Sequence, residues 1–259
     1  MSALEYRADL YDVIHGRRRQ DIAWYLDLCR RANGRVLELG AGTGRTVLPI
    51  ARAGIAIDAL DVAEEMREHL QGVLAAEAEQ VRANVRVLAG DMTTFSLPDS
   101  YRLIQIPFRS FLHNIAADQQ RACLDRCQAH LEPGGLLAFD VFLPSEAYMA
   151  AFEGEYEGLF RMDDPYPLTD DGFLLLSEWN AYDRAAQTVR AVHRYELLSK
   201  NGQIAESLYQ ILDLAFLYPQ DLERLLTAAG FTDITFYSDF TEQPVGPETR
   251  DVAVTARRI

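Results

Sequence analysis

Three glycines within five residues follow a short apolar run, and this arrangement constrains the fold more than any other feature of the chain. The stretch "RVLELGAGTGRTVLPIA", residues 35–51, passes from the glycines into a helical pattern. Glycine adopts positive φ at little cost and has no Cβ, so a ligand can approach its backbone. A buried strand, a glycine loop and a helix in this order are typical of a ligand site at the carboxyl edge of an open parallel sheet.

The remaining pattern predicts an α/β fold with an insertion. From residue 35 to about 143, short apolar runs alternate with helical segments of ten or more residues, which indicates a parallel sheet covered on both faces. Helices are expected at 21–32, 44–54, 63–80, 116–135 and 219–230, and strands at 35–39, 55–61, 84–91, 101–108, 136–143, 231–239 and 251–258. Between 144 and 218, alternating aromatic-rich segments separated by turns predict an inserted antiparallel β meander.

We therefore divide the chain into four parts. Residues 1–34 are expected to form an N-terminal flap and a helix, and residues 35–143 the cofactor-binding core. Residues 144–218 would form the β insert, as a wall or lid for the substrate, and residues 219–259 the last helix and strands of the core.

Composition argues against several classes of partner and site. The chain has 39 acidic and 25 basic residues, a formal net charge of −14, which disfavours nucleic acid and favours a small-molecule substrate. No run of 18 apolar residues predicts a membrane span, and the first 20 residues lack the order of a signal peptide. Cys29, Cys123 and Cys127 predict neither a disulfide framework nor a metal site, and fit a reducing cytoplasm.

The glycine spacing argues against a dinucleotide. A dinucleotide fold favours G-x-G-x-x-G, whereas residues 40–44 read G-x-G-x-G and Arg45 occupies the place of the third glycine. Glu38 would also place a carboxylate beside the ligand, which is unfavourable next to a pyrophosphate and suits an ammonium group. The loop therefore predicts a cationic ligand instead of NAD.

"VLELGAGTGR", residues 36–45, resembles the first motif of the class I S-adenosylmethionine-dependent methyltransferases. The resemblance extends over about residues 6–258 and implies a Rossmann-like, mostly parallel seven-stranded sheet with S-adenosyl-L-methionine as cofactor. It implies that Gly40, Ala41 and Gly42 pass beside the methionine part and the ribose, while Glu38 helps to hold the aminoacyl end.

Further acids follow the next two expected strands. By the resemblance, Asp61 accepts hydrogen bonds from the ribose hydroxyls, and Val62 and Met66 pack near the adenine. "GDM" resembles the family's adenine-binding step, which gives cofactor roles to Gly90, Asp91 and Met92. Each acid alone is equally typical of a helix cap or turn, but three acids beside one glycine loop indicate a cofactor site.

The segment after the fourth core strand is where the acceptor site is expected. "QIPF", residues 105–108, superficially matches an N-methyltransferase pattern, but Gln105 is longer than the Asn or Asp of that pattern. "PFRSFLHN", residues 107–114, together with the N-terminal "ADLYD…GR…D", resembles bacterial small-molecule methyltransferases such as the aminosugar N,N-dimethyltransferases. The resemblance assigns Pro107 to the cofactor site and Arg109 to the substrate.

The same resemblance implies a flap over the site. Tyr11 would take part in catalysis, His15 would contact the substrate, and Arg18 would pair with the cofactor's carboxylate or else remain solvated. "FDVFLPSEAY", residues 139–148, lacks the aromatic cluster of the aminosugar enzymes, so only the broader small-molecule class is implied.

Methyl transfer needs alignment and exclusion of water more than it needs acid or base chemistry. An amine acceptor must be neutral, whereas a hydroxyl or carbon acceptor needs a base, for which His113 is the leading candidate, with helix capping or a core role as its alternatives. On the insert, Trp179, His193 and Tyr195 face either the substrate or a plain sheet surface.

Two other functions compete with methyl transfer to a small molecule: a non-catalytic S-adenosylmethionine-binding protein and a protein or nucleic-acid methyltransferase. The acceptor atom and the oligomeric state are not readable from the chain.

Overall fold

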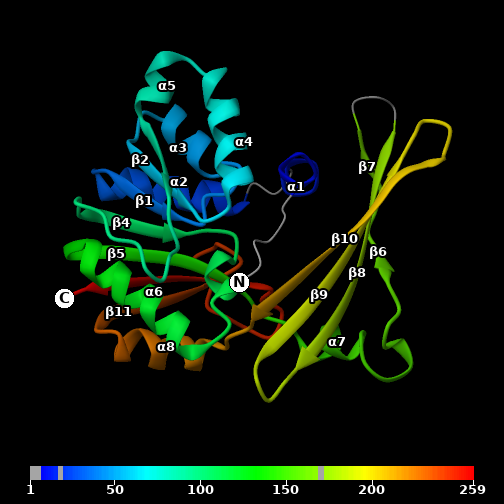
Figure 1. The fold of residues 1–259 in the computed structure, drawn as a ribbon. Helices are drawn as coiled ribbons and strands as arrows, with labels where there is room; N and C mark the ends of the chain where they lie inside the picture. Colours follow the sequence, from blue (N-terminus) through cyan, green and yellow to red (C-terminus); the bar gives the residue numbers. More distant parts are fainter. Residues whose placement is uncertain (1–6, 17–19, 169–171) are drawn as a thin grey trace.

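The structure is a computed structural model that describes residues 7–16, 20–168 and 172–259 (Figure 1). The helices are α1 (Ala8–His15), α2 (Gln20–Ala32), α3 (Val47–Arg52), α4 (Glu64–Ala75), α5 (Glu79–Ala83), α6 (Ala117–His130), α7 (Glu146–Ala150) and α8 (Pro219–Ala228), with 3-10 turns η1 (Ser110–His113) and η2 (Gly154–Tyr156). The strands are β1 (Val36–Leu39), β2 (Ile57–Asp61), β3 (Val85–Ala89), β4 (Tyr101–Ile106), β5 (Leu131–Phe142), β6 (Arg161–Met162), β7 (Tyr166–Pro167), β8 (Phe173–Asp183), β9 (Thr188–Leu198), β10 (Ile204–Ala215), β11 (Phe231–Ser238) and β12 (Asp251–Arg258).

The core is a seven-stranded sheet in the order β11-β12-β5-β4-β1-β2-β3. Strands β3, β2, β1, β4 and β5 are parallel, and β12 is antiparallel to both of its neighbours. The strand order reverses between β1 and β4, which is the place where open α/β sheets bind ligands. The predicted α/β class and the mostly parallel seven-stranded sheet are confirmed.

Helices cover both faces of this sheet (Figure 1). On one face, α2, α3 and α4 bury Tyr25, Ile50 and Leu70 in an apolar cluster with β1 and β2. On the other face, α6 and α8 bury Leu124 and Leu222 against β4, β5 and β12. Because strands with both faces covered have no polar side, the continuous apolar runs of the sequence are explained.

Two of the predicted helices end earlier than expected. The helix predicted over 63–80 is two helices, α4 and α5, because Ala78 is extended (φ −60°, ψ 147°). The helix predicted over 116–135 ends at His130, and Pro133 and both following glycines belong to the start of β5, where its register with β4 shifts.

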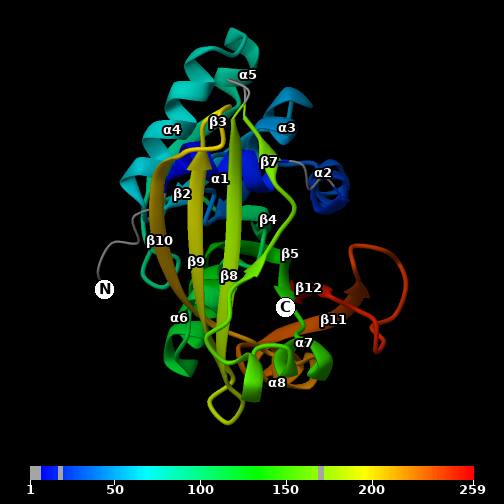
Figure 2. The same cartoon turned by 90° about the vertical axis from the view of Figure 1, so that its right-hand side faces the viewer.

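Strands β8, β9 and β10 form the long antiparallel ribbon of the insert, with β6 and β7 paired to β8 (Figure 2). The predicted antiparallel meander is thus confirmed. Helix α1 lies between the core and this ribbon (Figure 1). Its Leu10 and Ile14 pack on Leu174 and Leu176 of β8 and on Tyr195 of β9, so one face of the ribbon is turned towards α1 and the core.

In the described parts of the chain, none of the helices has both the length and the apolar character that a membrane span requires.

Candidate active site

The glycine loop follows β1 directly, and its three glycines serve different purposes. Gly40, Gly42 and Gly44 all have positive φ, of 70°, 55° and 89°. A Cβ on Gly40 would lie 2.8 Å from the Cβ of Ser110, and one on Gly44 would lie 2.3 Å from a methyl of Leu70, so both positions exclude side chains for packing reasons. A Cβ on Gly42 would meet no atom within 4 Å. Only Gly42 therefore borders open space that a ligand can use.

Asp61 is fixed against this loop. Its carboxylate accepts hydrogen bonds from the amides of Gly42, at 2.7 Å, and of Ala63, at 2.8 Å. The side chain is buried, and burial raises the pKa of Asp61, although the two amides act in the opposite direction. The predicted neighbourhood of Asp61 and the glycine loop is present.

The next strand contributes a second acid at the same edge. The amide and hydroxyl of Thr93 donate to one oxygen of Asp91, at 2.8 and 2.7 Å, and the amide of Gly90 donates to the carbonyl of Asp61 at 3.1 Å. The thioether of Met92 accepts from the Asn114 amide at 3.2 Å. The β3 loop is thus joined to the Asp61 end of β2 and to η1.

The two apolar residues predicted near the adenine differ in exposure. Val62 is 70% exposed, so it offers an apolar surface next to Asp61, whereas Met66 is buried.

Pro107 is buried at the end of β4, and its carbonyl accepts from the Ser110 hydroxyl at 2.8 Å. Ala41 is also buried, and its amide donates to Leu60.

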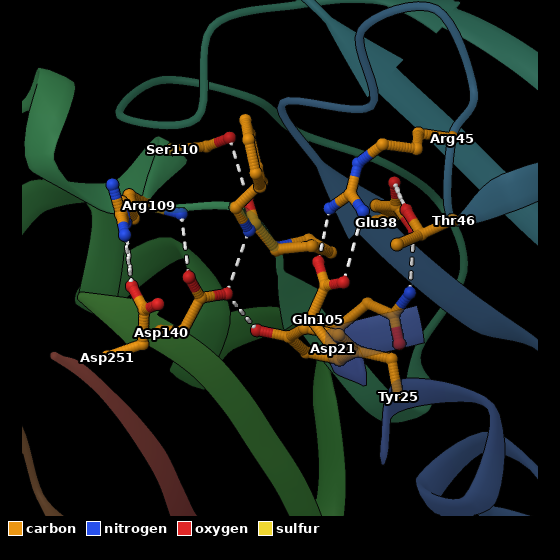
Figure 3. Close-up of polar contacts among 12 residues, drawn as sticks. Asp21, Tyr25, Glu38, Arg45, Thr46, Gln105, Arg109, Ser110, Asp140 and Asp251 are labelled. Atoms are coloured by element: carbon orange, nitrogen blue, oxygen red, sulfur yellow. Dashed lines mark hydrogen bonds and ion pairs between the residues drawn. The ribbon is translucent and has the colours of Figure 1, made fainter. Parts of the chain in front are cut away.

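Glu38 lies in the protein interior next to the glycine loop, and it does not reach the surface of that loop. The side chain is 1% exposed, and its carboxylate accepts from the Thr46 hydroxyl at 2.5 Å and from the Gln105 amide at 2.6 Å (Figure 3). Burial raises the pKa of Glu38 to about 7, and the nearby Arg45 cation partly opposes this. Both oxygens have partners within the protein, so contact of Glu38 with an aminoacyl group stays a prediction.

Gln105 has the place of the short polar residue in the N-methyltransferase pattern, and the structure shows what it does. It is fully buried, donates to Glu38 and accepts from the Cys29 thiol at 3.2 Å. Gln105 therefore links β4 to β1 and α2 and faces the protein interior.

Arg45, in the place of the third dinucleotide glycine, forms a buried ion pair with Asp21 of α2 (Figure 3). The two side chains are only 8% and 7% exposed, and the guanidinium lies 4.3 Å from the ring centre of Phe108. Asp21 was not among the predicted site residues, because an acidic side chain on a helix is usually solvated. Arg45 thus joins the glycine loop, α2 and the loop after β4.

Asp140 binds the loop that follows β4, and it too was not among the predicted site residues. Asp140 accepts from the amides of Phe108, at 2.7 Å, and Arg109, at 3.0 Å, and from the Tyr25 hydroxyl, at 2.6 Å (Figure 3). Burial raises the pKa of Asp140 to about 7. A single acid inside the apolar run "LLAFDVFL" was the signal that could have found it.

Arg109, predicted to contact the substrate, is engaged within the protein. Its guanidinium donates to Asp251 of β12 at 2.8 Å and lies 5.5 Å from the ring centre of Phe142. Because Asp251 already neutralises this arginine, Arg109 is a weak candidate for binding an anionic substrate group.

Helix α1 brings two of the predicted residues to the loop after β4. The ring centres of Tyr11 and His15 lie 4.6 Å apart, and His15 lies 4.9 Å from Phe108. Asp12 on the same helix accepts from the Thr43 hydroxyl of the glycine loop at 2.6 Å and contacts His69 of α4 at 3.0 Å. The helix therefore covers the glycine loop, as the predicted flap would.

Arg18, predicted to pair with the cofactor's carboxylate, lies outside the described residues.

His113 ends η1, one residue before Asn114, which contacts Met92. The side chain is half-buried, and burial lowers the pKa of His113 to about 4. The imidazole is therefore neutral at pH 7, so it can accept a proton or a hydrogen bond but is a weak base.

Trp179 lies on β8, and its contact with the substrate stays a prediction. Side chains alternate along β8, and Leu174 and Leu176 face α1, so Trp179 points to the opposite, outer face of the ribbon. His193 and Tyr195 of β9 pair with Glu178 and Leu176, which places them on the inner face.

Among residues 7–16, 20–168 and 172–259, no three His, Cys, Asp or Glu side chains are grouped as metal ligands would be. All three cysteines are buried, and none of them forms a disulfide.

Residues 36–135, which include the glycine loop and all three acids, match the family model described as a methyltransferase domain. A curated relative, the cypemycin N-terminal methyltransferase of a Streptomyces species, is 25% identical over 172 residues, which span 66% of this chain and 64% of that protein.

Solved methyltransferase structures share the fold of the whole chain. The CcbJ methyltransferase from Streptomyces caelestis superposes with a TM-score of 0.76, covering 97% of this chain and 95% of that one at 23% identity. The structure of S-adenosylmethionine-bound CalS10, an amino pentose methyltransferase from Micromonospora echinaspora, superposes with a TM-score of 0.72 over 100% of both chains at 18% identity. Residues 36–135 thus match a methyltransferase domain, and the whole chain shares the α/β fold of these S-adenosylmethionine-dependent enzymes, as its glycine loop predicted.

Proposed function

We propose that the protein transfers a methyl group from S-adenosylmethionine to the nitrogen of a small-molecule amine. The observation that carries the cofactor site is the pair formed by Gly42 and Asp61. A carboxylate is held against the one loop glycine that borders open space, at the reversal of strand order.

The described residues fit the cofactor. Gly42 leaves room for it beside the backbone, and Asp61 is placed to accept from ribose hydroxyls. Val62, with its exposed side chain, and Asp91 would flank the adenine. These assignments follow the family resemblance, and the fit rests on the open side of Gly42 and on the carboxylate beside it.

When bound, S-adenosylmethionine supplies a methyl group on a sulfonium; an amine lone pair displaces it, so that a C–N bond forms as the C–S bond breaks and the sulfur leaves as a neutral thioether. The tasks of the chain are orientation and exclusion of water. Helix α1 covers the glycine loop through Asp12, and Tyr11 and His15 close the space near Phe108. A dry site lowers the pKa of an amine and so favours its reactive neutral form.

An amine is the acceptor that His113 suits best. A neutral imidazole with a pKa of about 4 is too weak a base to ionise a hydroxyl, but it can accept a hydrogen bond from an amine N–H and so orient the lone pair. Two of the similar proteins are named for related chemistry, an N-terminal methyltransferase and an amino pentose methyltransferase.

The proposal is tested in two steps. Isothermal calorimetry with S-adenosylhomocysteine tests cofactor binding, and transfer of labelled methyl from S-adenosylmethionine to a panel of amines, alcohols and carbon acids tests the reaction. The expected products carry the label on nitrogen. Label only on oxygen or carbon would contradict the amine acceptor, and binding without transfer to any acceptor would favour the non-catalytic alternative. The assignment of residues 144–218 as substrate wall and location in the cytoplasm stay predictions.

A further inference from the structure

Helix α1 contacts the core with one of its faces. The carboxylate of Asp12 accepts from the Thr43 hydroxyl at 2.6 Å with one oxygen and contacts the His69 ring nitrogen at 3.0 Å with the other. One turn earlier, the amide of Ala8 donates to Glu65 of α4 at 3.4 Å. Asp12 therefore joins α1 to two separate parts of the core, the glycine loop and α4.

The opposite face of α1 contacts the insert. Leu10 and Ile14 are buried in one apolar cluster with Leu176 of β8. Arg7, directly before the helix, pairs with Glu206 of β10 at 2.9 Å. The core-facing and insert-facing residues of α1 are offset by about half a turn, so they lie on nearly opposite faces of the helix. Helix α1 is thus a direct connection between the β8–β10 ribbon and the glycine loop (Figure 1).

The loop residue that Asp12 contacts lies between two flexible positions. Thr43 is flanked by Gly42 and Gly44, both of which have positive φ, and the Gly42 amide donates to Asp61 at 2.7 Å. Glycine has more backbone freedom than any other residue, so a loop of this kind needs side-chain contacts to keep one conformation. The Thr43 side chain is buried, and its hydroxyl supplies such a contact to Asp12.

The contact can be removed without opening the core. The Asp12 side chain is 43% exposed and that of His69 is 29% exposed. Replacement of Asp12 therefore creates no internal cavity, and its effect on ligand binding can be measured in a folded protein.

We propose, building on the cofactor site proposed above, that Asp12 is a positioning residue that couples the insert to the cofactor site through α1. While the ribbon holds α1 in place, Asp12 keeps Thr43 and the adjacent Gly42 in the conformation that binds S-adenosylmethionine. When α1 leaves its seat on the ribbon, Asp12 no longer holds the loop and the affinity for the cofactor falls. The coupling is reciprocal, so bound cofactor in turn holds α1 against the insert.

The first arm of the test measures the Kd of S-adenosylhomocysteine by calorimetry. In Asp12→Ala we expect Kd to rise about tenfold, because a smaller fraction of the molecules holds the loop in the binding conformation. Asp12→Asn keeps an acceptor oxygen for Thr43 and should stay within about threefold of the wild type. Asp9→Ala is the matched control, since it removes another carboxylate of α1, one that pairs with Arg7 on the exposed side.

The two variants of the first arm decide between outcomes. An unchanged Kd in Asp12→Ala, or an equal rise in Asp9→Ala, would overturn the role of Asp12 while leaving the cofactor site intact. A wild type that fails to bind S-adenosylhomocysteine would instead contradict the proposed cofactor site, and this inference with it.

The second arm is a double-mutant cycle that a local structural role would not satisfy. Leu176→Ala weakens the seat of α1 on the insert, and we expect it to raise Kd for S-adenosylhomocysteine about threefold in the wild type. In the Asp12→Ala background the same change should have no effect, because the connection is already broken.

Val189→Ala is the control for Leu176→Ala, because Val189 is buried on the same face of the ribbon but lies outside the cluster around α1. Urea unfolding of each variant is measured first, so that Kd is compared between folded proteins. Absence of a rise in Leu176→Ala, an equal rise in Val189→Ala, or effects of Leu176→Ala and Asp12→Ala that simply add in free energy would refute the coupling.

Discussion

The carboxylate of Asp140 on β5 accepts a hydrogen bond of 2.7 Å from the amide of Phe108, the residue at which the chain leaves β4 in a left-handed conformation. Phe108 and Arg109 have φ of 57° and 64°, a region that bulky side chains rarely adopt and that costs about 1–3 kcal/mol for each residue. Asp140 offsets this strain by accepting from both amides. The strained turn then brings Ser110 against Gly40 and Phe108 against His15, so Asp140 positions both the cofactor loop and the flap.

Replacement of this carboxylate tests its role. Asp140→Ala leaves two part-buried amides and the buried Tyr25 hydroxyl without this acceptor, and we expect the free energy of unfolding in urea to fall by roughly 3 kcal/mol. Asp140→Asn keeps one acceptor oxygen and is expected to lose less. Asp164→Ala, at an exposed position, serves as the control. If Asp140→Ala and Asp164→Ala were equally stable, the loop would not depend on Asp140.

The open side of Gly42 predicts a specific loss of ligand binding. At a hundredfold excess over Kd, S-adenosylhomocysteine should stabilise the wild type by about 2.7 kcal/mol, seen as a rise in Tm. In Gly42→Val the side chain enters the space beside the loop, and the rise should vanish.

Gly72→Val is the matched control for Gly42→Val, because Gly72 lies exposed on α4 and a Cβ there also meets no atom within 4 Å. Since positive φ at Gly42 strains valine, the unliganded Tm of each variant is measured first, and only the ligand-induced shift is compared. A full shift in folded Gly42→Val would place the cofactor elsewhere.

The sequence predicted the elements whose signals are local. The glycine loop, the strands of the core and the ribbon of the insert are encoded by periodicity and turn residues over short stretches. Asp61 and Asp91 could be predicted because each ends an expected strand, and parallel strands end at one edge of a sheet. What the sequence did not reveal are pairs joined only by folding, such as Asp21 with Arg45.

The side on which a strand residue points was harder to predict. Trp179 and Glu178 are neighbours in the chain, and an aromatic ring is the more conspicuous candidate for a substrate wall. Which of the two points inward depends on the contact of Leu174 and Leu176 with α1, which is a long-range contact. A register shift of one residue would exchange the two faces, so the pattern alone could not decide.

The buried ion pair of Arg45 and Asp21 predicts strong coupling in stability. Arg45→Met removes the cation and leaves a buried carboxylate, so we expect a loss of about 3–5 kcal/mol in the free energy of unfolding. The double variant Arg45→Met/Asp21→Leu removes both charges and should recover much of that loss. Chemical unfolding of the four proteins gives the coupling energy, and losses that simply add would show that the two charges do not interact.

The lowered pKa of His113 predicts the sign of one contribution to pH-dependent stability. Between pH 4 and 6.5 the unfolded chain, with an ordinary imidazole, binds a proton that the folded protein does not bind. The contribution of His113 to the free energy of unfolding therefore increases as the pH rises from 4 to 6.5, and it is constant above pH 6.5. The wild type is compared with His113→Gln, which lacks this contribution. The contributions of other titrating groups, such as Glu38 and Asp140, largely cancel in the difference between the two free energies of unfolding. After allowance for solvent screening at a half-buried site, the difference should change by about 2 kcal/mol from pH 4 to 6.5. An NMR titration that gives His113 a pKa near 6.5, or a flat difference, would contradict both this expectation and the neutral hydrogen-bond acceptor proposed for the transfer.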